Sequence, residues 1–481
     1  MSNPYGVCSI RSIDWQVLVG HAIHVAWGWL MFTGSTFSME SGNLIDVPLL
    51  PDPLYTLSLG ANACTLLAFA VLYRRGVPLF KREGVSVAAS VLMCVGTFMA
   101  TRFVGVLLGQ PTALVEAFAG LATGMGTAIF LLLWGEVFVS LGARRCLIYF
   151  SASSLAAAAM HIAAGFLPVE CVQAAVSLFP LVEIILYRSY ISSNRLAVSK
   201  RNSGRRGSAV LPANVVALGL FFGFSFGTTR GFISLFDGAT DADVRNIVSM
   251  VFVMLACVLA YSVSIVRKVD FGGLIYRIAL PLVALGFLFI PLSGAWSFAG
   301  TAAYRMGYEY VYIILWMLWV FFARRSEASS TWILACGLAS VQMSKFVGFV
   351  VSADIVDLWS ATLDMGLVSS VALFLILLFA LFSKESRIDE SGWEEVRPAA
   401  EKEEAVFSEQ SYAPIADILG LSPRETEVFY LLLRGRSRSY IAQELVVTEE
   451  TVKSHVKGIY LKSGVHTKQD LIDRVEAMMG R

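Results

Sequence analysis

Charged residues are scarce in this sequence. They make up 15% of its 481 residues, whereas soluble domains contain about 25%. Apolar residues make up 56%, and the mean hydropathy is +0.68. This composition excludes a wholly soluble protein and indicates that lipid solvates most of the chain.

Cysteine patterns and catalytic motifs are missing as well. The seven cysteines are scattered without a Cys-x-x-Cys pair, which argues against a zinc site or a disulfide framework, so we expect buried free thiols. We find no P-loop, Gly-rich dinucleotide motif, metal-ligand pair or nucleophile elbow. The sequence therefore predicts no catalytic residues, no metal and no cofactor, and a protein that is not an enzyme. A cleavable signal peptide is not evident either, because residues 1–12 are short and polar.

Long apolar stretches fill most of the chain. Each is long enough to cross a hydrocarbon core of roughly 30 Å as a helix. Their spans are 15–37, 54–73, 85–108, 113–139, 146–166, 169–190, 212–235, 244–266, 273–292, 297–322, 330–351 and 363–382. We therefore expect an all-α protein with a polytopic membrane domain of twelve helices at residues 1–383.

The charges between these stretches predict their orientation. Even-numbered loops carry the basic residues, such as Arg144 and Arg145, whereas odd-numbered loops are acidic or uncharged, apart from Arg245. Basic loops stay on the cytoplasmic side. We expect a multi-pass protein of the bacterial inner (cytoplasmic) membrane, with membrane lipid around it and with both termini and the C-terminal domain in the cytoplasm.

The sixth loop, roughly residues 191–211, is long, basic and rich in Ser and Gly, and it divides the stretches six and six. Arg74-Arg75-Gly76 and Lys81-Arg82-Glu83-Gly84 stand in the second loop. In span number, central loop and topology, this region resembles the major facilitator superfamily of transporters. The family's second loop normally includes an aspartate that is missing here.

Ionisable residues at membrane depth are the candidates for a ligand site, because each is unfavourable there unless it has a partner. Arg305 and Glu309 are four residues apart and could instead form a structural ion pair, as could Arg102 and Glu116 between helices. Arg230 and Lys345 have no evident acidic partner within their own helices, so either one could bind an anionic group of a ligand. The candidate ligand-binding residues are His21, His24, Arg102, Glu116, Arg230, Arg305, Glu309 and Lys345.

Small residues recur every four positions in two of the stretches, and such spacing lets helices approach closely. One set is Gly219, Gly223, Gly227 and Gly231, and the other is Gly120, Gly124 and Ala128. These faces predict close packing within the chain, with dimerisation as the alternative.

The C-terminal fifth differs in character. Residues 384–417 carry 4 basic and 10 acidic residues without an apolar period, so we expect a flexible acidic linker. Residues 418–481 carry regular apolar stripes that predict four helices, with capping residues Ser422, Ser437, Thr448 and Thr467. Two helices joined by a short turn form a helix-turn-helix layout.

Several motifs in this segment resemble the LuxR-type helix-turn-helix. They are Leu421-Ser-Pro-Arg-Glu425, Ile441-Ala442-x-Glu444-Leu445, Thr451-Val452-Lys453-x-His455-Val456 and Lys462-x-Gly464-Val465. The resemblance implies binding to double-stranded DNA, with Lys453, Ser454 and Lys457 at base edges. It also implies that Thr448, Thr451 and His455 help to hold phosphates, and that the last helix supports a homodimer on DNA.

Ser463 departs from the family pattern, which usually has a core leucine there. We expect the loss of roughly 1.5–3 kcal/mol of burial free energy, offset by the neighbouring Leu461.

A DNA-binding segment joined to twelve predicted membrane helices, without a receiver or soluble ligand-binding domain, indicates a membrane-anchored one-component transcriptional regulator. The membrane domain would sense a small molecule that the sequence leaves unidentified. The alternatives are a bifunctional protein that transports its ligand and controls transcription, and a passive anchor.

Overall fold

The computed structural model divides into two compact units, one within residues 10–396 and one within residues 397–481. The structure describes residues 14–33, 36–37, 52–74, 77–107, 113–202, 211–236, 242–263, 278–292, 295–326, 328–359, 366, 370–371, 373, 414–433, 438–445, 447–465 and 467–478. Each unit is considered by itself below.

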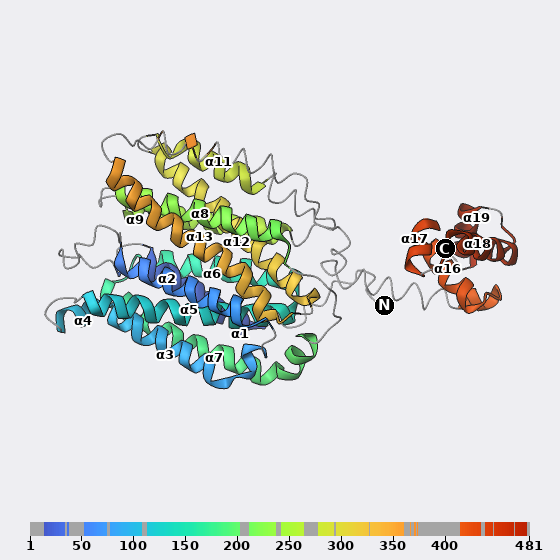
Figure 1. The fold of residues 1–481 in the computed structure, drawn as a ribbon, viewed down its shortest axis with the longest axis horizontal. Coiled ribbons are helices and arrows are strands. Elements are labelled where there is room, and N and C mark those ends of the chain that lie inside the picture. The colour runs from blue at the N-terminus through green and yellow to red at the C-terminus, as the bar shows by residue number, and fades with distance from the viewer. Residues whose placement is uncertain are drawn as a thin grey trace, which may run out of the picture. The chain divides into compact units, whose positions relative to one another are not determined.

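The first unit is a bundle of helices that run side by side, with α3 and α7 at one side and α11 at the other (Figure 1). Its N-terminal group comprises α1 (Trp15–Phe32), α2 (Pro53–Leu72), α3 (Glu83–Met99), the short α4 (Arg102–Leu107), α5 (Ala113–Leu141), α6 (Ala143–Ala164) and α7 (Val169–Asn202). Its C-terminal group comprises α8 (Ala213–Phe236), α9 (Ala242–Val263), α11 (Leu280–Phe289), α12 (Ala295–Arg325) and α13 (Ser330–Trp359).

Every described α-helix of this unit overlaps a predicted apolar stretch, which agrees with an all-helical membrane domain. Eight of the described helices are long and apolar enough to cross a membrane, whereas α1, α3 and α11 are shorter or less apolar. The twelfth predicted stretch, 363–382, lies almost entirely outside the described residues. The count of twelve and its division into six and six therefore stay predictions.

The regularly spaced glycines bring helices into close contact within the chain. A Cβ added to Gly223 or Gly227 of α8 would overlap the backbone of α13, and one added to Gly124 of α5 would overlap the backbone of α2 at Ser58. Small residues at this spacing allow such an approach. These faces are occupied inside the bundle, so the packing interpretation holds for them.

Contacts between α2 and α13 and between α6 and α9 join the N-terminal and C-terminal groups. The large buried side chains Trp27, Trp134, Trp316 and Trp319 lie inside this bundle. The expectation that the cysteines are buried holds for Cys146 and Cys257 but is wrong for Cys64 and Cys171, which are exposed. A thiol on a membrane helix can face lipid, so an apolar segment does not imply a protein contact.

The second unit contains a short turn of helix at 414–418, then α16 (Pro423–Leu433), α17 (Arg438–Glu444), α18 (Glu449–Ser463) and α19 (Lys468–Met478). Ser422 and Glu425 form the predicted capping box, and Thr467 and Asp470 form another. Thr448 caps α18 through the Thr451 amide, and Gly464 ends that helix in the left-handed conformation. Ser437 lies outside the described residues.

Two details of this unit correct the sequence expectations. Ile415 and Ala416, which we assigned to the linker, are buried in the helical core because the short turn at 414–418 packs against it. Leu461 does not offset Ser463: the Ser463 side chain is buried, whereas Leu461 is 83% exposed. The two residues lie on different faces of α18, since successive helical positions are about 100° apart.

Candidate ligand cavity and DNA-binding helix

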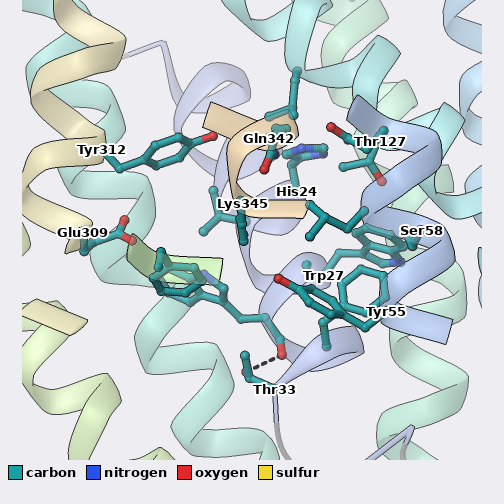
Figure 2. A pocket seen from close by; sticks show the side chains of 18 of the residues that line it. His24, Trp27, Thr33, Tyr55, Ser58, Thr127, Glu309, Tyr312, Gln342 and Lys345 are labelled. Carbon is teal, nitrogen blue, oxygen red and sulfur yellow. Dashed lines mark hydrogen bonds between the residues drawn. The ribbon is translucent and has the colours of Figure 1, made fainter. Parts of the chain in front are cut away.

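A cavity of about 190 Å³ lies inside the membrane unit between α1, α2, α5, α6, α8, α12 and α13. Figure 2 shows Glu309 and Tyr312 of α12 on one wall and Tyr55 and Ser58 of α2 on the other, with Lys345 of α13 between them. Both helix groups therefore contribute to its lining.

Six of the eight predicted ligand-binding residues line this cavity. They are His21, His24, Arg230, Arg305, Glu309 and Lys345. Spacing along the sequence did not reveal that residues more than 300 positions apart share one cavity, because only helix packing brings them together. Arg102 and Glu116 do not line it, and no ion pair joins those two described side chains.

The three cations project from the C-terminal group. Gly227 lets α8 approach the Lys345 carbonyl oxygen of α13, and Arg230 follows almost one turn later on α8. The Arg230 guanidinium donates a hydrogen bond to the Phe32 carbonyl oxygen and lies over the Tyr55 ring, 3.7 Å from its centroid. The Lys345 Nζ lies 4.7 Å from the centroid of the Phe226 ring. Aromatic faces stabilise both cations in a region of low dielectric constant.

Arg305 and Glu309 do not form the predicted structural ion pair. Within the described chain, no charged nitrogen of Arg305 comes within 4.0 Å of a Glu309 carboxylate oxygen, and Arg305 and Lys345 have no hydrogen-bond or ion-pair partner. Arg230, Arg305 and Lys345 nevertheless lie close enough to repel one another, and Glu309 attracts both Arg305 and Lys345. With three cations and one carboxylate, the charged lining has an excess of positive charge.

The two histidines are held by partners within the N-terminal group. His21 Nδ1 and Ser153 Oγ are hydrogen-bonded at 2.6 Å, and His24 Nδ1 lies 3.0 Å from Glu183 Oε1. Trp134 Nε1 also donates to Glu183 Oε1, at 2.8 Å. The hydrogen bond to Ser153 orients the His21 ring, whereas His24 Nδ1 lies beside Glu183 without a hydrogen-bond partner among the described residues.

Two buried polar residues of α2 were missed by the sequence reasoning. The Asn62 Oδ1 and the Tyr55 hydroxyl have no hydrogen-bond partner among the described residues, although each side chain lines the cavity and each residue is only 4% exposed. Both residues are uncharged, so a search for intramembrane charges did not single them out. What could have indicated them in the sequence is that each is a polar residue within a predicted apolar stretch, 54–73.

A third missed residue, Glu136 of α5, is completely buried at the other end of the unit. Its carboxylate accepts hydrogen bonds from the Leu79 and Phe80 amides at 2.8 and 2.9 Å, and from the Thr331 hydroxyl of α13. It therefore joins the loop between α2 and α3 to both helix groups. Being one acidic residue in a long apolar run, it met the same criterion as the predicted candidates.

In the second unit, α18 separates a buried face from an exposed one. Val452, Val456 and Ile459 are buried, as the apolar stripe predicted. Of the predicted DNA-binding residues, Thr448, Thr451, Lys453, Ser454 and Lys457 are exposed and His455 is half-buried. Glu450 Oε1 lies 2.9 Å from Lys453 Nζ, but a surface pair of this kind contributes little stability and leaves the lysine free to move. The exposed face of α18 is therefore open to a major groove.

Residues 419–475 match the family described as bacterial regulatory proteins, luxR family. This segment is a LuxR-type helix-turn-helix domain. The helices α17 and α18, packed on a small buried core, agree with this match, which implies DNA binding.

The membrane unit is similar to solved transporters. The human organic anion transporter MFSD10 (TETRAN) matches at 13% identity with a TM-score of 0.53, covering 77% of this chain and 98% of that one. A bacterial homologue of the iron transporter ferroportin, in the outward-facing state with soaked iron, matches at 15% identity with a TM-score of 0.54. The match covers 78% of this chain and 99% of that one. The major facilitator superfamily proton:xylose symporter XylE, bound to 6-bromo-6-deoxy-D-glucose, matches at 15% identity with a TM-score of 0.54. The match covers 80% of this chain and 97% of that one. The LuxR-type domain is thus joined to a membrane unit with the major facilitator fold.

Proposed function

We propose that this protein is a membrane-anchored one-component transcriptional regulator of the bacterial inner membrane. A small molecule occupies the cavity of the membrane unit, and its binding changes how the LuxR-type domain dimerises or meets double-stranded DNA. Lys453, Ser454 and Lys457 contact base edges, while Thr448, Thr451 and His455 help to hold phosphates. Both termini and the LuxR-type domain lie in the cytoplasm.

The observation that carries this proposal is a cavity lined by both helix groups in a chain that ends in a DNA-binding domain. A ligand that contacts Tyr55 on α2 and Lys345 on α13 stabilises one relative position of the two groups. Because a ligand shifts an equilibrium only by its differential affinity for two states, contacts to both groups are what a sensor requires.

The position of the cavity supports entry of the ligand from outside the cell. With the N-terminus in the cytoplasm, α1 and α8 run outward, and the lining residues Thr33 and Arg230 stand near their outer ends. The predicted cytoplasmic end is closed by contacts between the two groups, namely Glu136 with Thr331 and the Arg324 guanidinium with the Val139 carbonyl oxygen at 3.1 Å.

Sensing is tested with a transcriptional reporter driven by a promoter that the protein controls, found by comparing transcripts of the wild-type and deletion strains. We expect Lys345→Met to abolish the response to the inducing molecule, because it removes one of three cavity cations, which outnumber the single lining carboxylate, Glu309. Arg188→Gln, on an exposed pair with Glu83 outside the cavity, is the matched control. An unchanged response in the Lys345 variant, with transcription set independently of small molecules, would favour a passive anchor.

The alternative is a transporter that also regulates, and the major facilitator fold of the membrane unit favours it. Uptake of the inducing molecule into vesicles that contain the purified full-length chain separates the two functions. A sensor binds the molecule without net flux, whereas accumulation above empty vesicles establishes transport.

DNA recognition is tested by replacing both exposed lysines of α18. We expect Lys453→Ala with Lys457→Ala to weaken promoter binding at least about 100-fold in a mobility-shift titration, since each lysine contact to a guanine or phosphate contributes roughly 1–3 kcal/mol. Arg474→Ala, an exposed cation on α19, is the control and should bind as the wild type does. A footprint retained by the double variant would show that α18 is not the recognition helix.

A further inference from the structure

Resting on the proposed sensing function, we propose that the ligand is a small aromatic carboxylate with a hydroxyl group at its far end. Three features of the cavity carry this assignment: an excess of cations on one side, an apolar aromatic middle, and an unpartnered hydrogen-bond acceptor on the other side.

The cationic side selects an anion. Arg230, Arg305 and Lys345 line the cavity with Glu309 as the one carboxylate among the lining residues. Like charges in a low-dielectric interior repel strongly unless an opposite charge lies among them. A carboxylate placed between Arg305 and Lys345, which have no hydrogen-bond or ion-pair partner among the described residues, removes that repulsion and accepts their hydrogen bonds.

The middle of the cavity selects a flat apolar body. The rings of Phe226 and Tyr308 stack with centroids 3.9 Å apart, and Tyr308 and Tyr312 stack at 6.0 Å. Trp27 and Tyr55 line the cavity from α1 and α2. An apolar cavity of roughly 150 Å³ holds benzene, so a cavity of about 190 Å³ admits one substituted ring. Flat faces of this kind pack against an aromatic ring.

The far side selects a neutral hydrogen-bond donor. Asn62 Oδ1 is buried without a hydrogen-bond partner among the described residues, and Asn62 lies two helical turns along α2 from Tyr55, about 10 Å deeper. An orphaned buried acceptor is unfavourable, so a ligand hydroxyl that donates to it adds affinity. A ligand ammonium is disfavoured there, because Glu309 is the one carboxylate among the described lining residues and Glu183 does not line the cavity.

The test measures the thermal unfolding of the purified full-length protein in detergent with five probes. They are 4-hydroxybenzoate, benzoate, the neutral 4-hydroxybenzamide, the cation tyramine, and inorganic phosphate. We expect 4-hydroxybenzoate to raise the unfolding temperature most and benzoate less. The amide, tyramine and phosphate should leave it unchanged.

Two variants assign the effect to the two sides of the cavity. Lys345→Met should raise the half-saturating concentration of 4-hydroxybenzoate roughly 10- to 100-fold, since a hydrogen bond to a charged group is lost, while Lys345→Arg retains most of the affinity. Asn62→Leu should raise the half-saturating concentration of 4-hydroxybenzoate roughly 2- to 10-fold, to that of benzoate. Arg188→Gln should bind like the wild type.

The ligand class is overturned if tyramine or the amide stabilises the protein as strongly as the carboxylates, if phosphate alone does so, or if no probe shifts the unfolding temperature. These outcomes differ from failure of the proposed function. If the carboxylates bind but leave the reporter unchanged, the ligand class stands and sensing fails. If tyramine induces the reporter, sensing stands and the ligand class fails.

Discussion

Ser463 is the weakest point in the core of the LuxR-type domain. It is 1% exposed, and its hydroxyl has no hydrogen-bond partner in the described part of the chain. An unpaired buried polar group is unfavourable by about 1–3 kcal/mol. Replacing the hydroxymethyl side chain with a methyl group removes this penalty and should stabilise the domain.

We therefore expect Ser463→Ala to raise the free energy of unfolding of a fragment of residues 397–481 by about 1 kcal/mol, measured by urea denaturation. Ser454→Ala on the exposed face of α18 is the control and should change it by less than about 0.5 kcal/mol. A loss of stability in the Ser463 variant would mean that the hydroxyl is bonded in solution.

An ion pair fastens the recognition helix to α16. The Lys462 Nζ lies 2.6 Å from Glu425 Oε2 and also donates to the Gly420 carbonyl oxygen at 2.9 Å. Gly458 makes room for this carboxylate, because a Cβ there would lie 2.6 Å from Glu425 Oε1. The hydrogen bond from Lys462 and those from Ser422 lower the pKa of Glu425 to about 2.

This shift predicts how the domain responds to acid. A carboxyl group whose folded pKa lies below its unfolded value of roughly 4.3 stabilises the fold fully above that value. Its contribution should disappear as the pH falls from about 5 towards 2. We expect Glu425→Gln to lower the free energy of unfolding at pH 7 by roughly 1–2 kcal/mol, a modest figure because Lys462 is partly exposed.

The measurement is urea denaturation of the same fragment between pH 7 and pH 3, with Glu449→Gln as a control for an exposed carboxylate of α18. The difference in the free energy of unfolding between the wild type and Glu425→Gln should shrink as the pH falls. A difference that stays constant down to pH 3 would contradict the shift.

At the scale of elements, the contact between α8 and α13 positions the cationic side of the cavity. Gly227 and Gly223 let α8 lie against the α13 backbone at Lys345 and Val341. A side chain at Gly227 would push the two helices apart and move Lys345 away from the Phe226 ring that it faces. Overpacking of this kind destabilises by about 1–3 kcal/mol.

We expect Gly227→Ala to lower the thermal unfolding temperature of the full-length protein in detergent. Gly84→Ala is the matched control, because a Cβ at Gly84 of α3 meets nothing within 4 Å. Alanine improves helix propensity at both sites. Equal temperatures for the two variants would mean that the α8–α13 contact tolerates a methyl group.

At the scale of the whole molecule, the arrangement of charges gives a testable topology. Two reporter fusions test it: a reporter fused after Phe382 should be cytoplasmic, and one inserted after Asp46 in the first loop should be outside the cytoplasm. Paired alkaline phosphatase and fluorescent protein fusions measure this. Phosphatase activity after Phe382 would place the LuxR-type domain on the wrong side of the membrane for DNA.

The sequence predicts a flexible acidic linker before the LuxR-type domain. A coil of about 30 residues has a root-mean-square reach of roughly 30 Å. We therefore expect the output to be a change in the effective concentration or pairing of two LuxR-type domains, since such a tether would bring two domains together without fixing their orientation.

The sequence by itself determined the helical membrane character, the LuxR-type domain and most of its caps and core. These features depend on local patterns: apolar length, the 3.6-residue period, and capping residues such as Thr448 and Gly464. Six of the eight candidate ligand-binding residues line the cavity. They could be named from the sequence because a charge such as Lys345 is easily recognised within an apolar stretch.

Only the tertiary structure decided which of those residues share a cavity. Arg305 and Glu309 are spaced to pair on one helix, yet they do not, because α12 packs with both side chains facing a space that α2, α8 and α13 also enclose. Neutral residues such as Asn62 gain a role only from being buried without a partner, which depends on helices far away in sequence. Helix contacts such as that between α2 and α13 create that environment, and no local pattern encodes it.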